Sequence, residues 1–329
     1  MRSNHVLPTV SRMLLSIGMP ILLVGTAAAL LSVTPEPARE SRGLSAASAK
    51  RMASRHHGPM QLHKRISDST STSDNWAGYA VTGADGSVSN VQASWVIPSV
   101  ACSAALDDNS SYASFWTGID GDGSNTVEQV GTDSDCNAGS PSYYAWYEFY
   151  PDFSYTIGTY SKSGVCLKDC VSVGDIISAQ VDTGVSASAN STAKDKGPVH
   201  NQGNGFTVTI TDWGSSGKTI LWTFSTTHAV SGAKQVSAEW ITEADYGCRT
   251  SNKICFLSDF GTASYGQDYA PTPEMTGYAT VGGVTGPLGS FTSGLQQIIM
   301  VDVNDMTMAE PMPLKDGTSF QVNWYNAGP

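Results

Sequence analysis

The sequence predicts an all-β protein, folded as one antiparallel β-sandwich domain. Glycine (33), tyrosine (13) and tryptophan (8) are plentiful, and this composition favours strands and turns over helices. Beyond the N-terminus no long amphipathic helical pattern occurs. A dozen or more short extended runs are instead separated by turn residues, which is typical of sandwiches.

The expected strands follow one another without intervening helices. A hairpin is expected where two runs flank the glycine-containing turn 214–217. The full set is 75–81, 91–97, 115–119, 127–130, 143–150, 171–180, 206–212, 219–226, 237–242, 256–260, 278–281, 298–303 and 319–325.

The charge is divided unevenly along the chain. Residues 1–70 hold nine Lys/Arg against three acidic residues, whereas the remainder holds nine against 26. Nucleic acid is therefore not an expected partner, because an acidic body repels phosphates. Because the body has few bases, it carries only a modest positive charge once its carboxylates are protonated, which suits work in acid.

The first 33 residues have the pattern of a secretory signal peptide. Arg2 and Arg12 precede an apolar stretch, 13–33, that contains three consecutive alanines at 27–29. A single membrane anchor is the rival interpretation, since about 20 apolar residues can span a bilayer. The small-residue end favours the signal, and hence a secreted, extracellular protein with no membrane contact after maturation.

Residues 34–70 are rich in serine, alanine and arginine, and they contain His56, His57 and His63. Their apolar content is too low for independent packing, so they are either a disordered linker or a basic propeptide. A propeptide would pair its cations with the acidic body near neutral pH, and acid would weaken that pairing. Lys64-Arg65, or a site a few residues on, is a plausible processing point, which leaves 71–329 as the body.

Six cysteines lie in the body, and an even number after a secretory signal indicates disulfides. Six cysteines allow fifteen connectivities. The close pairs Cys166/Cys170 and Cys248/Cys255 suggest local bridges, which leaves Cys102 with Cys136. A zinc site is disfavoured because neither body histidine lies near a cysteine pair.

Familiar hydrolase motifs are absent or incomplete. There is no G-x-S-x-G or H-E-x-x-H motif. Asp182-Thr183-Gly184 matches one loop of an aspartic peptidase, but that chemistry needs two such loops and no second one is found. The run from Asp120 resembles the start of a calcium loop but lacks its later ligands.

Several carboxylate and amide side chains occupy unusual positions in predicted strands. Glu148 lies within an aromatic run, and Gln129 lies between Val127 and Val130. Glu239 and Glu243 share one face of their strand while Trp240 points to the other. Each of these alone is explained by an ordinary structural role.

Five motifs in order, however, resemble the glutamic peptidases (eqolisins), which are acid endopeptidases made as preproproteins. They are S-D-N-W-A-G-Y (73–79), F-W-T-G-I-D-G-D-G (115–123), E-Q-V-G-T-D (128–133), Y-Y-A-W-Y-E-F-Y-P (143–151) and A-E-W-I-T-E-A (238–244).

This resemblance implies two curved antiparallel sheets of the concanavalin-A-like lectin and glucanase type, with a substrate groove on the concave face. It also implies a catalytic pair, Gln129 and Glu243. The groove-lining positions that carry over are Trp76, Trp116, Asp120, Asp133 and Glu148. Glu128 replaces an apolar residue of the family pattern, and Ala244 replaces an acid.

The resemblance therefore predicts peptide-bond hydrolysis without a metal or cofactor. Glu243 would activate a water as general base, and the Gln129 amide would stabilise the oxyanion. Expected partners are protein or peptide substrates and the chain's own propeptide as intramolecular inhibitor, and the enzyme is expected to be a monomer.

Two other classes remain open from the sequence. One is a lectin-like or glucanase sandwich that acts on polysaccharide, for which Glu148 and Glu243 would be the carboxyl pair. The other is an inactive secreted binding module, which would require Gln129 and Glu243 to be separated in space.

Overall fold

The computed structural model describes residues 56–102, 110–162, 164–184, 204–247 and 254–328. The predicted signal peptide and residues 34–55 of the predicted propeptide lie outside these ranges. In the part of the chain that is described, no helix has the length and apolar character needed to cross a membrane.

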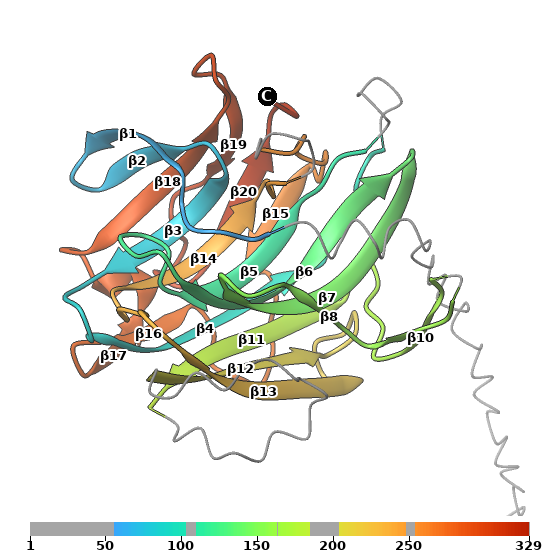
Figure 1. Cartoon of the computed structure of the whole chain (residues 1–329), viewed down its shortest axis with the longest axis horizontal. Helices are drawn as coiled ribbons and strands as arrows, with labels where there is room; N and C mark the ends of the chain where they lie inside the picture. Colours follow the sequence, from blue (N-terminus) through green and yellow to red (C-terminus); the bar gives the residue numbers. More distant parts are fainter. Residues whose placement is uncertain (1–55, 103–109, 163, 185–203, 248–253, 329) are drawn as a thin grey trace, which may run out of the picture. The chain divides into compact units, whose positions relative to one another are not determined.

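The described chain is built almost entirely of strands (Figure 1). They are β1 (Leu62–Ser67), β2 (Thr70–Ser73), β3 (Trp76–Thr82), β4 (Val88–Val96), β5 (Ser114–Ile119), β6 (Val127–Asn137), β7 (Ser140–Tyr150), β8 (Tyr155–Ile157), β9 (Thr159–Tyr160), β10 (Cys166–Lys168), β11 (Ile176–Thr183), β12 (Asn204–Asp212), β13 (Trp222–Val230), β14 (Ser237–Glu243), β15 (Thr262–Tyr265), β16 (Tyr278–Val281), β17 (Val284–Pro287), β18 (Leu295–Val301), β19 (Thr307–Pro311) and β20 (Phe320–Trp324), with one 3₁₀ turn, η2 (Leu288–Ser290).

The strands form the predicted antiparallel β-sandwich. One layer runs β18-β3-β14-β5-β6-β7-β8, with every neighbouring pair antiparallel. The other is centred on β4 and continues through β11 and β12 to β13. Strands β19 and β20 join the two layers through pairings with β18 and β15. Figure 1 shows β4 and β11–β13 running beside the strands of the first layer.

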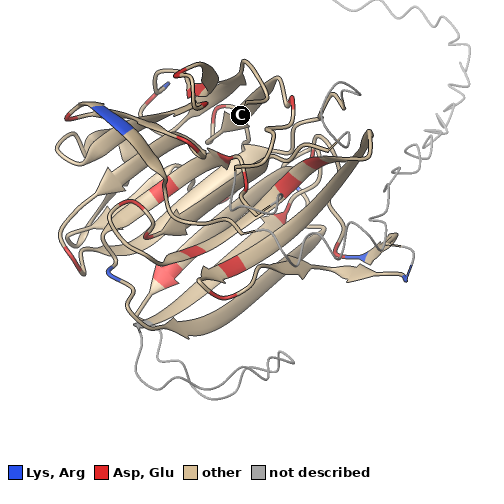
Figure 2. Ribbon diagram, turned by 45° about the horizontal axis from the view of Figure 1, so that its top comes forward, with Lys and Arg blue, Asp and Glu red and all other residues tan. Residues whose placement is uncertain are grey.

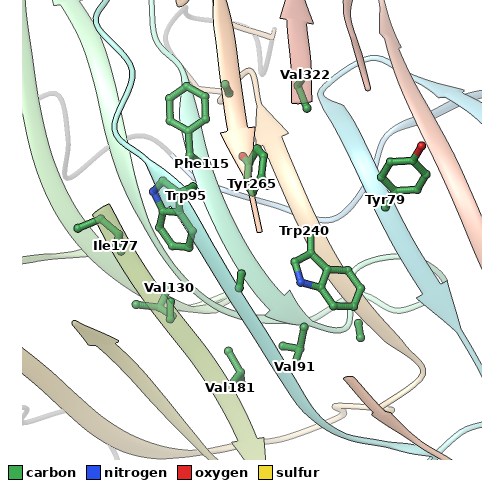
Figure 3. Close-up of a cluster of buried hydrophobic side chains, with 14 of the residues drawn as sticks. Tyr79, Val91, Trp95, Phe115, Val130, Ile177, Val181, Trp240, Tyr265 and Val322 are labelled. Carbon is green, nitrogen blue, oxygen red and sulfur yellow. The ribbon is translucent and has the colours of Figure 1, made fainter. Parts of the chain in front are cut away.

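The main hydrophobic core lies between the two layers. It includes Trp95 and Val181 from one layer and Phe115 and Trp240 from the other (Figure 3). The Trp240 indole donates a hydrogen bond to the Gln92 carbonyl oxygen 2.9 Å away, so the one polar atom of this core side chain has a hydrogen-bond partner. Alternation along β14 then forces Glu239, Ile241 and Glu243 to the opposite side of the sheet.

The predicted hairpin is confirmed, since β12 pairs with β13 from Asn204 opposite Val230 to Asp212 opposite Trp222. The predicted strand 256–260 is wrong. Only isolated bridges occur there, at Leu257 and Asp259, and the strand begins at Thr262. Strand β6 also continues seven residues past the predicted end, through a polar run that the core pattern does not reveal.

The end of the predicted propeptide is ordered rather than a linker without structure. Strand β1 is exposed along its whole length and is held by antiparallel pairing with β2. Strand β2 in turn pairs in parallel with β18, and Ser71, Thr72 and Ser73 are buried. Backbone pairing, which apolar content does not measure, therefore places these polar residues in the fold.

Two predicted disulfides are confirmed. Cys102 pairs with Cys136 and Cys166 pairs with Cys170. Cys255 is also disulfide-bonded, and its expected partner, Cys248, lies outside the described residues.

Gly78 is required where β3 lies between β14 and β18. It has φ of +148°, and an added Cβ would lie 2.1 Å from the Trp240 carbonyl oxygen.

We predict that Gly78→Ala lowers the free energy of unfolding by about 3 kcal/mol, because backbone atoms of β14 cannot move aside cheaply. Gly86→Ala is the control: that glycine has φ of +79° but no atom within 4 Å of the added Cβ, and it should cost about 1 kcal/mol. Urea unfolding of both variants measures the difference, and equal losses would contradict the steric argument.

Candidate active site

The side of the first layer that faces away from the main core carries an unusual set of buried polar side chains. We call it the acidic face and define it by Trp76, Trp116, Gln129, Asp133, Trp146, Glu148, Glu239 and Glu243, all of which are at most 1% exposed. Figure 2 shows acidic residues on the strands themselves as well as in the loops. The tryptophans of this face form a second apolar cluster with Ile241, separate from the main core.

The register explains why residues far apart in sequence meet on this face. Gln129 lies opposite Gly118 on one side and Glu148 on the other, and Glu239 lies opposite Gly118 from β14. A parallel row places Glu243 opposite Ser114, which is itself opposite Asp133. Because strand alternation has a period of two, every member of both rows points the same way.

Glu243 ends β14 and is completely buried. Its two carboxylate oxygens accept hydrogen bonds from the Asn75 amide at 3.1 Å and from the Trp116 indole at 2.9 Å. Burial raises the pKa of Glu243 well above its usual value, although the nearby His57 charge and the Asn75 hydrogen bond oppose the shift. The site thus holds a carboxyl group with fixed orientation and increased basicity.

Gln129 lies two strands away from Glu243, near the start of β6. Its side-chain amide donates to the backbone carbonyl oxygen of His57 and lies 3.4 Å from a Glu148 oxygen. No direct hydrogen bond joins the described side chains of Gln129 and Glu243. The two are connected instead through a segment of the chain that covers the face.

That segment comprises residues 56–61, which lie within the predicted propeptide. His56 forms an antiparallel bridge with Tyr246, and Met60 donates its backbone N–H to Gly121. The Asn75 amide group that holds Glu243 also donates to the Pro59 carbonyl at 3.3 Å. The segment is therefore a peptide whose backbone groups are hydrogen-bonded across the predicted catalytic residues.

The His57 side chain is buried within the acidic face. Its ring stacks on the Trp146 indole with centroids 3.6 Å apart and an interplanar angle of 2°. Its Nδ1 lies 3.1 Å from Glu148, and its Nε2 lies 3.5 Å from Asp133 and 3.6 Å from Asp245. Burial alone lowers the pKa of His57, but the charges of Asp245 and Asp133 outweigh it, so the net pKa is well above 6.5.

The nearby carboxylates are themselves held in place by neutral donors. Asp133 accepts from the Trp146 indole and the Tyr144 hydroxyl, each at 2.5 Å. The Ser114 hydroxyl donates to Asp245 at 2.6 Å. These donors are aromatic groups and a strand residue that lie outside the covering segment, so each carboxylate keeps hydrogen-bond donors besides His57.

His57, Asp133 and Asp245 also form a group that could hold a metal ion, with ligand atoms within 4.8 Å of one another. All three residues are buried. A protonated imidazole between two carboxylates satisfies the same electrostatic requirement without an ion. Charge balance among these three residues is therefore reached through the imidazolium itself.

The remaining sequence candidates have different surroundings. Asp120 directly follows β5 and accepts hydrogen bonds from the backbone N–H groups of residues 234–236, so its carboxylate organises the loop before β14. Trp76 contacts Trp116 edge-on, with ring centroids 4.9 Å apart. Asp182 lies on β11 in the other layer and accepts from Asn90 and Gln180.

Sequence reasoning did not identify His57, Asn75, Trp146 or Asp245 as site residues. Two of them had a usable signal: Trp146 shares the strand face of Glu148, and Asp245 follows Glu243 at the same spacing. Ala244 replaces the acid of the family pattern, and the structure has the next residue, Asp245, beside the site. His57 and Asn75 depend on how the N-terminal segment crosses the face, which has no local signature.

Comparison with known proteins gives consistent results. Residues 74–286 match the model of the Peptidase A4 family. The chain is 28% identical over 244 residues to Aspergillopepsin-2 of Aspergillus niger, which covers 68% of this chain and 71% of that protein.

Two solved structures share the fold. A scytalido-glutamic peptidase with a transition state analogue inhibitor gives a TM-score of 0.53 at 20% identity, with 77% of this chain and 98% of that chain covered. SCP-B, an eqolisin in complex with the tripeptide Ala-Ile-His, gives 0.50 at 16% identity with the same coverage.

The buried imidazole makes the stability of the full chain depend on pH. Because the folded pKa of His57 is raised, its stabilising contribution is complete below the unfolded pKa of about 6.5. It is lost as pH rises through the folded value. We predict that His57→Gln lowers the melting temperature of the full chain by about 3 °C at pH 6, and that the difference narrows toward pH 9. Melts at several pH values measure it, with His228→Gln at the surface as control. A difference that stays constant or grows with pH would contradict the charged state of His57.

Proposed function

The chain belongs to the Peptidase A4 family and is a glutamic endopeptidase, a hydrolase of peptide bonds, and on that premise we propose that Glu243 and Gln129 are its catalytic pair. The observation that carries this proposal is the extended segment across the acidic face. Its His57 carbonyl is hydrogen-bonded to Gln129, and its Pro59 carbonyl shares the Asn75 amide with Glu243.

Glu243 is suited to act as general base and then general acid. The His57 charge and the Asn75 hydrogen bond favour its ionised form against the effect of burial, and the proton that the ionised form takes from a water molecule is available for the departing amine. Asn75 and Trp116 each occupy one carboxylate oxygen, which fixes the carboxyl plane. The orientation of the base therefore does not have to be set by the substrate.

Gln129 is suited to stabilise the tetrahedral intermediate. Its amide already donates to a peptide carbonyl oxygen in this structure, and the same donor would bind the oxygen more strongly as negative charge develops on it. The neutral amide keeps this capacity at every pH. The surrounding carboxylates would neutralise the charge of a lysine at this position, but they do not weaken a neutral amide donor in this way.

The same geometry supports an inhibitory role for the N-terminal segment. Residues 56–61 occupy the face where a substrate peptide would lie, so residues 34–70 would act as an intramolecular propeptide inhibitor. The body would begin near β2, because Ser71–Ser73 are buried against β18. The disulfides fit secretion directed by residues 1–33, and the active enzyme would be a monomer. The polysaccharide alternative gains no support, since the relatives described above are peptidases.

Substitution of the catalytic pair tests the mechanism. Gln129→Ala should reduce kcat on a peptide substrate at about pH 4 by roughly 10²–10³, the usual effect of removing one oxyanion donor. Glu243→Gln should reduce it by about 10³ or more, because the amide cannot accept the proton. Matched controls are Gln321→Ala and Glu310→Gln, on β20 and β19. Near wild-type activity in either site variant would remove that residue from the mechanism.

Inhibitor and chelator tests separate this mechanism from its rivals. EDTA should leave peptidase activity unchanged, because no proposed step uses a metal ion. A transition-state inhibitor of aspartic peptidases should also have little effect, since the one D-T-G loop holds Asp182 in hydrogen bonds with Asn90 and Gln180. Loss of activity on chelation would implicate the cluster at His57, and potent inhibition by the aspartic-type compound would implicate Asp182.

A further inference from the structure

We propose that the acidic face selects a protonated histidine on the acyl side of the bond to be cut, and that His57–Gly58 is therefore the first bond cut in the enzyme's own chain. This inference rests on the proposed catalytic pair. It adds a substrate class and a processing site, and it differs from the dibasic processing point that the sequence suggests at Lys64-Arg65.

The backbone contacts identify which bond is presented. The proposed oxyanion donor, Gln129, holds the carbonyl oxygen of His57 and not that of a neighbouring residue. The backbone N–H of His57 donates to Glu148 at 3.0 Å. Beyond the bond, Asn75 holds the Pro59 carbonyl and Glu243 together. The segment is thus anchored on both sides of His57–Gly58, with its carbonyl directed as a substrate's would be.

The side-chain pocket fits an imidazolium ion in shape and in charge. The flat ring stacks on Trp146 at 3.6 Å, which a flexible lysine chain would not reproduce. Both ring nitrogens lie within 3.6 Å of carboxylate oxygens, from Glu148 on one edge and from Asp133 and Asp245 on the other. A leucine in this place would leave buried carboxylates without a counter-charge, which is costly.

Other titratable groups around the pocket are consistent with this assignment. His56 Nδ1 lies 3.2 Å from the second oxygen of Glu148, so that carboxylate serves both histidines. The charge of His57 also opposes the raised pKa of Glu243. A cationic residue at this position therefore helps the proposed base to ionise, which couples substrate selection to the state of the catalytic group.

The position after the bond favours glycine, because any side chain there would require the Tyr246 ring to move. A Cβ on Gly58 would lie 2.3 Å from the Tyr246 hydroxyl oxygen and 2.4 Å from a ring carbon. The Tyr246 hydroxyl itself donates a hydrogen bond to the Tyr150 hydroxyl at 2.9 Å, and this bond limits the movement of the Tyr246 ring. The His-Gly pair is therefore matched to the face at both of its residues.

The cleavage step is an ordinary hydrolysis. Glu243 takes a proton from water while the water oxygen bonds to the His57 carbonyl carbon, and the oxyanion is held by Gln129. When the carbon–nitrogen bond to Gly58 breaks, Glu243 returns the proton to the Gly58 nitrogen. The products are the His57 carboxyl group and a chain whose amino terminus is Gly58.

Processing of the full chain tests the site. Purified full chain, moved to about pH 4 where model carboxyl groups begin to protonate, should first yield a polypeptide that begins at Gly58, detected by intact mass and N-terminal sequencing. The rate constant should not change over a tenfold range of protein concentration, because the segment lies in its own active site. His57→Leu should slow formation of this terminus by at least about 100-fold, whereas His63→Leu, in the exposed strand β1, should not.

The outcomes separate this inference from the proposed catalytic pair. If the first product of an active enzyme begins elsewhere, for example after Arg65, or if His57→Leu is processed at the wild-type rate, the histidine assignment is wrong while the catalytic pair stands. If Glu243→Gln still processes itself and cleaves peptides, the catalytic pair is wrong.

Peptide substrates test selection independently of processing. The matured enzyme should cleave a peptide containing His-Gly-Pro with kcat/KM at least about tenfold higher than the same peptide with Leu-Gly-Pro. Asp245→Asn should reduce this ratio and should act mainly through KM for the histidine peptide. Equal cleavage of the two peptides by the wild type, or a ratio that Asp245→Asn leaves unchanged, would overturn the proposal.

Discussion

The burial of several carboxyl groups on one face of a sheet is the constraint on which the rest of the site depends. An ionised carboxylate cannot be removed from water without a counter-charge or hydrogen-bond donors. Here the donors come from tryptophan, tyrosine, serine and asparagine side chains that are fixed by strands, as for Asp133 and Glu243. The counter-charge comes from His57, which the chain itself supplies. Removal of the covering segment would expose these groups to water and would create room for another peptide of similar character.

The sandwich makes this concentration possible because its two faces have separate tasks. On β14, Trp240 contributes to the core between the layers, while Glu239 and Glu243 belong to the acidic face. The stability of the fold therefore comes mainly from one side of the layer. The other side is free to hold polar groups whose burial is unfavourable. Glu239 illustrates the cost, because burial raises its pKa well above the usual value although nothing in the proposed mechanism uses it.

The sequence predicted the architecture because strand alternation and turn residues are local signals. The hairpin at β12 and β13 follows from such patterns, as does the shared face of Glu239 and Glu243, whereas the pairing of Gln129 with Glu243 was expected only from the family resemblance. The predictions that were wrong or missed also have physical reasons. The region 256–260 is apolar enough for a strand but forms only isolated bridges, and β1 is a strand without any buried side chain. The role of His57 depends on the path of a segment across the face, and a path of this kind leaves no local pattern in the sequence.

A neutral amide as proposed oxyanion donor is consistent with this environment. A lysine or arginine at position 129 would form an ion pair with Glu148, 3.4 Å from the present amide nitrogen, and its charge would then be shared with a group other than the reacting oxygen. The amide dipole of glutamine is not neutralised in this way and does not change with pH. The pH dependence of the site is thereby left to its carboxyl groups and to the imidazole that they surround. Because His57 is both the counter-charge of the closed site and the residue next to the presented bond, its departure after hydrolysis would remove a cation from the face and leave the carboxylates ready to accept another.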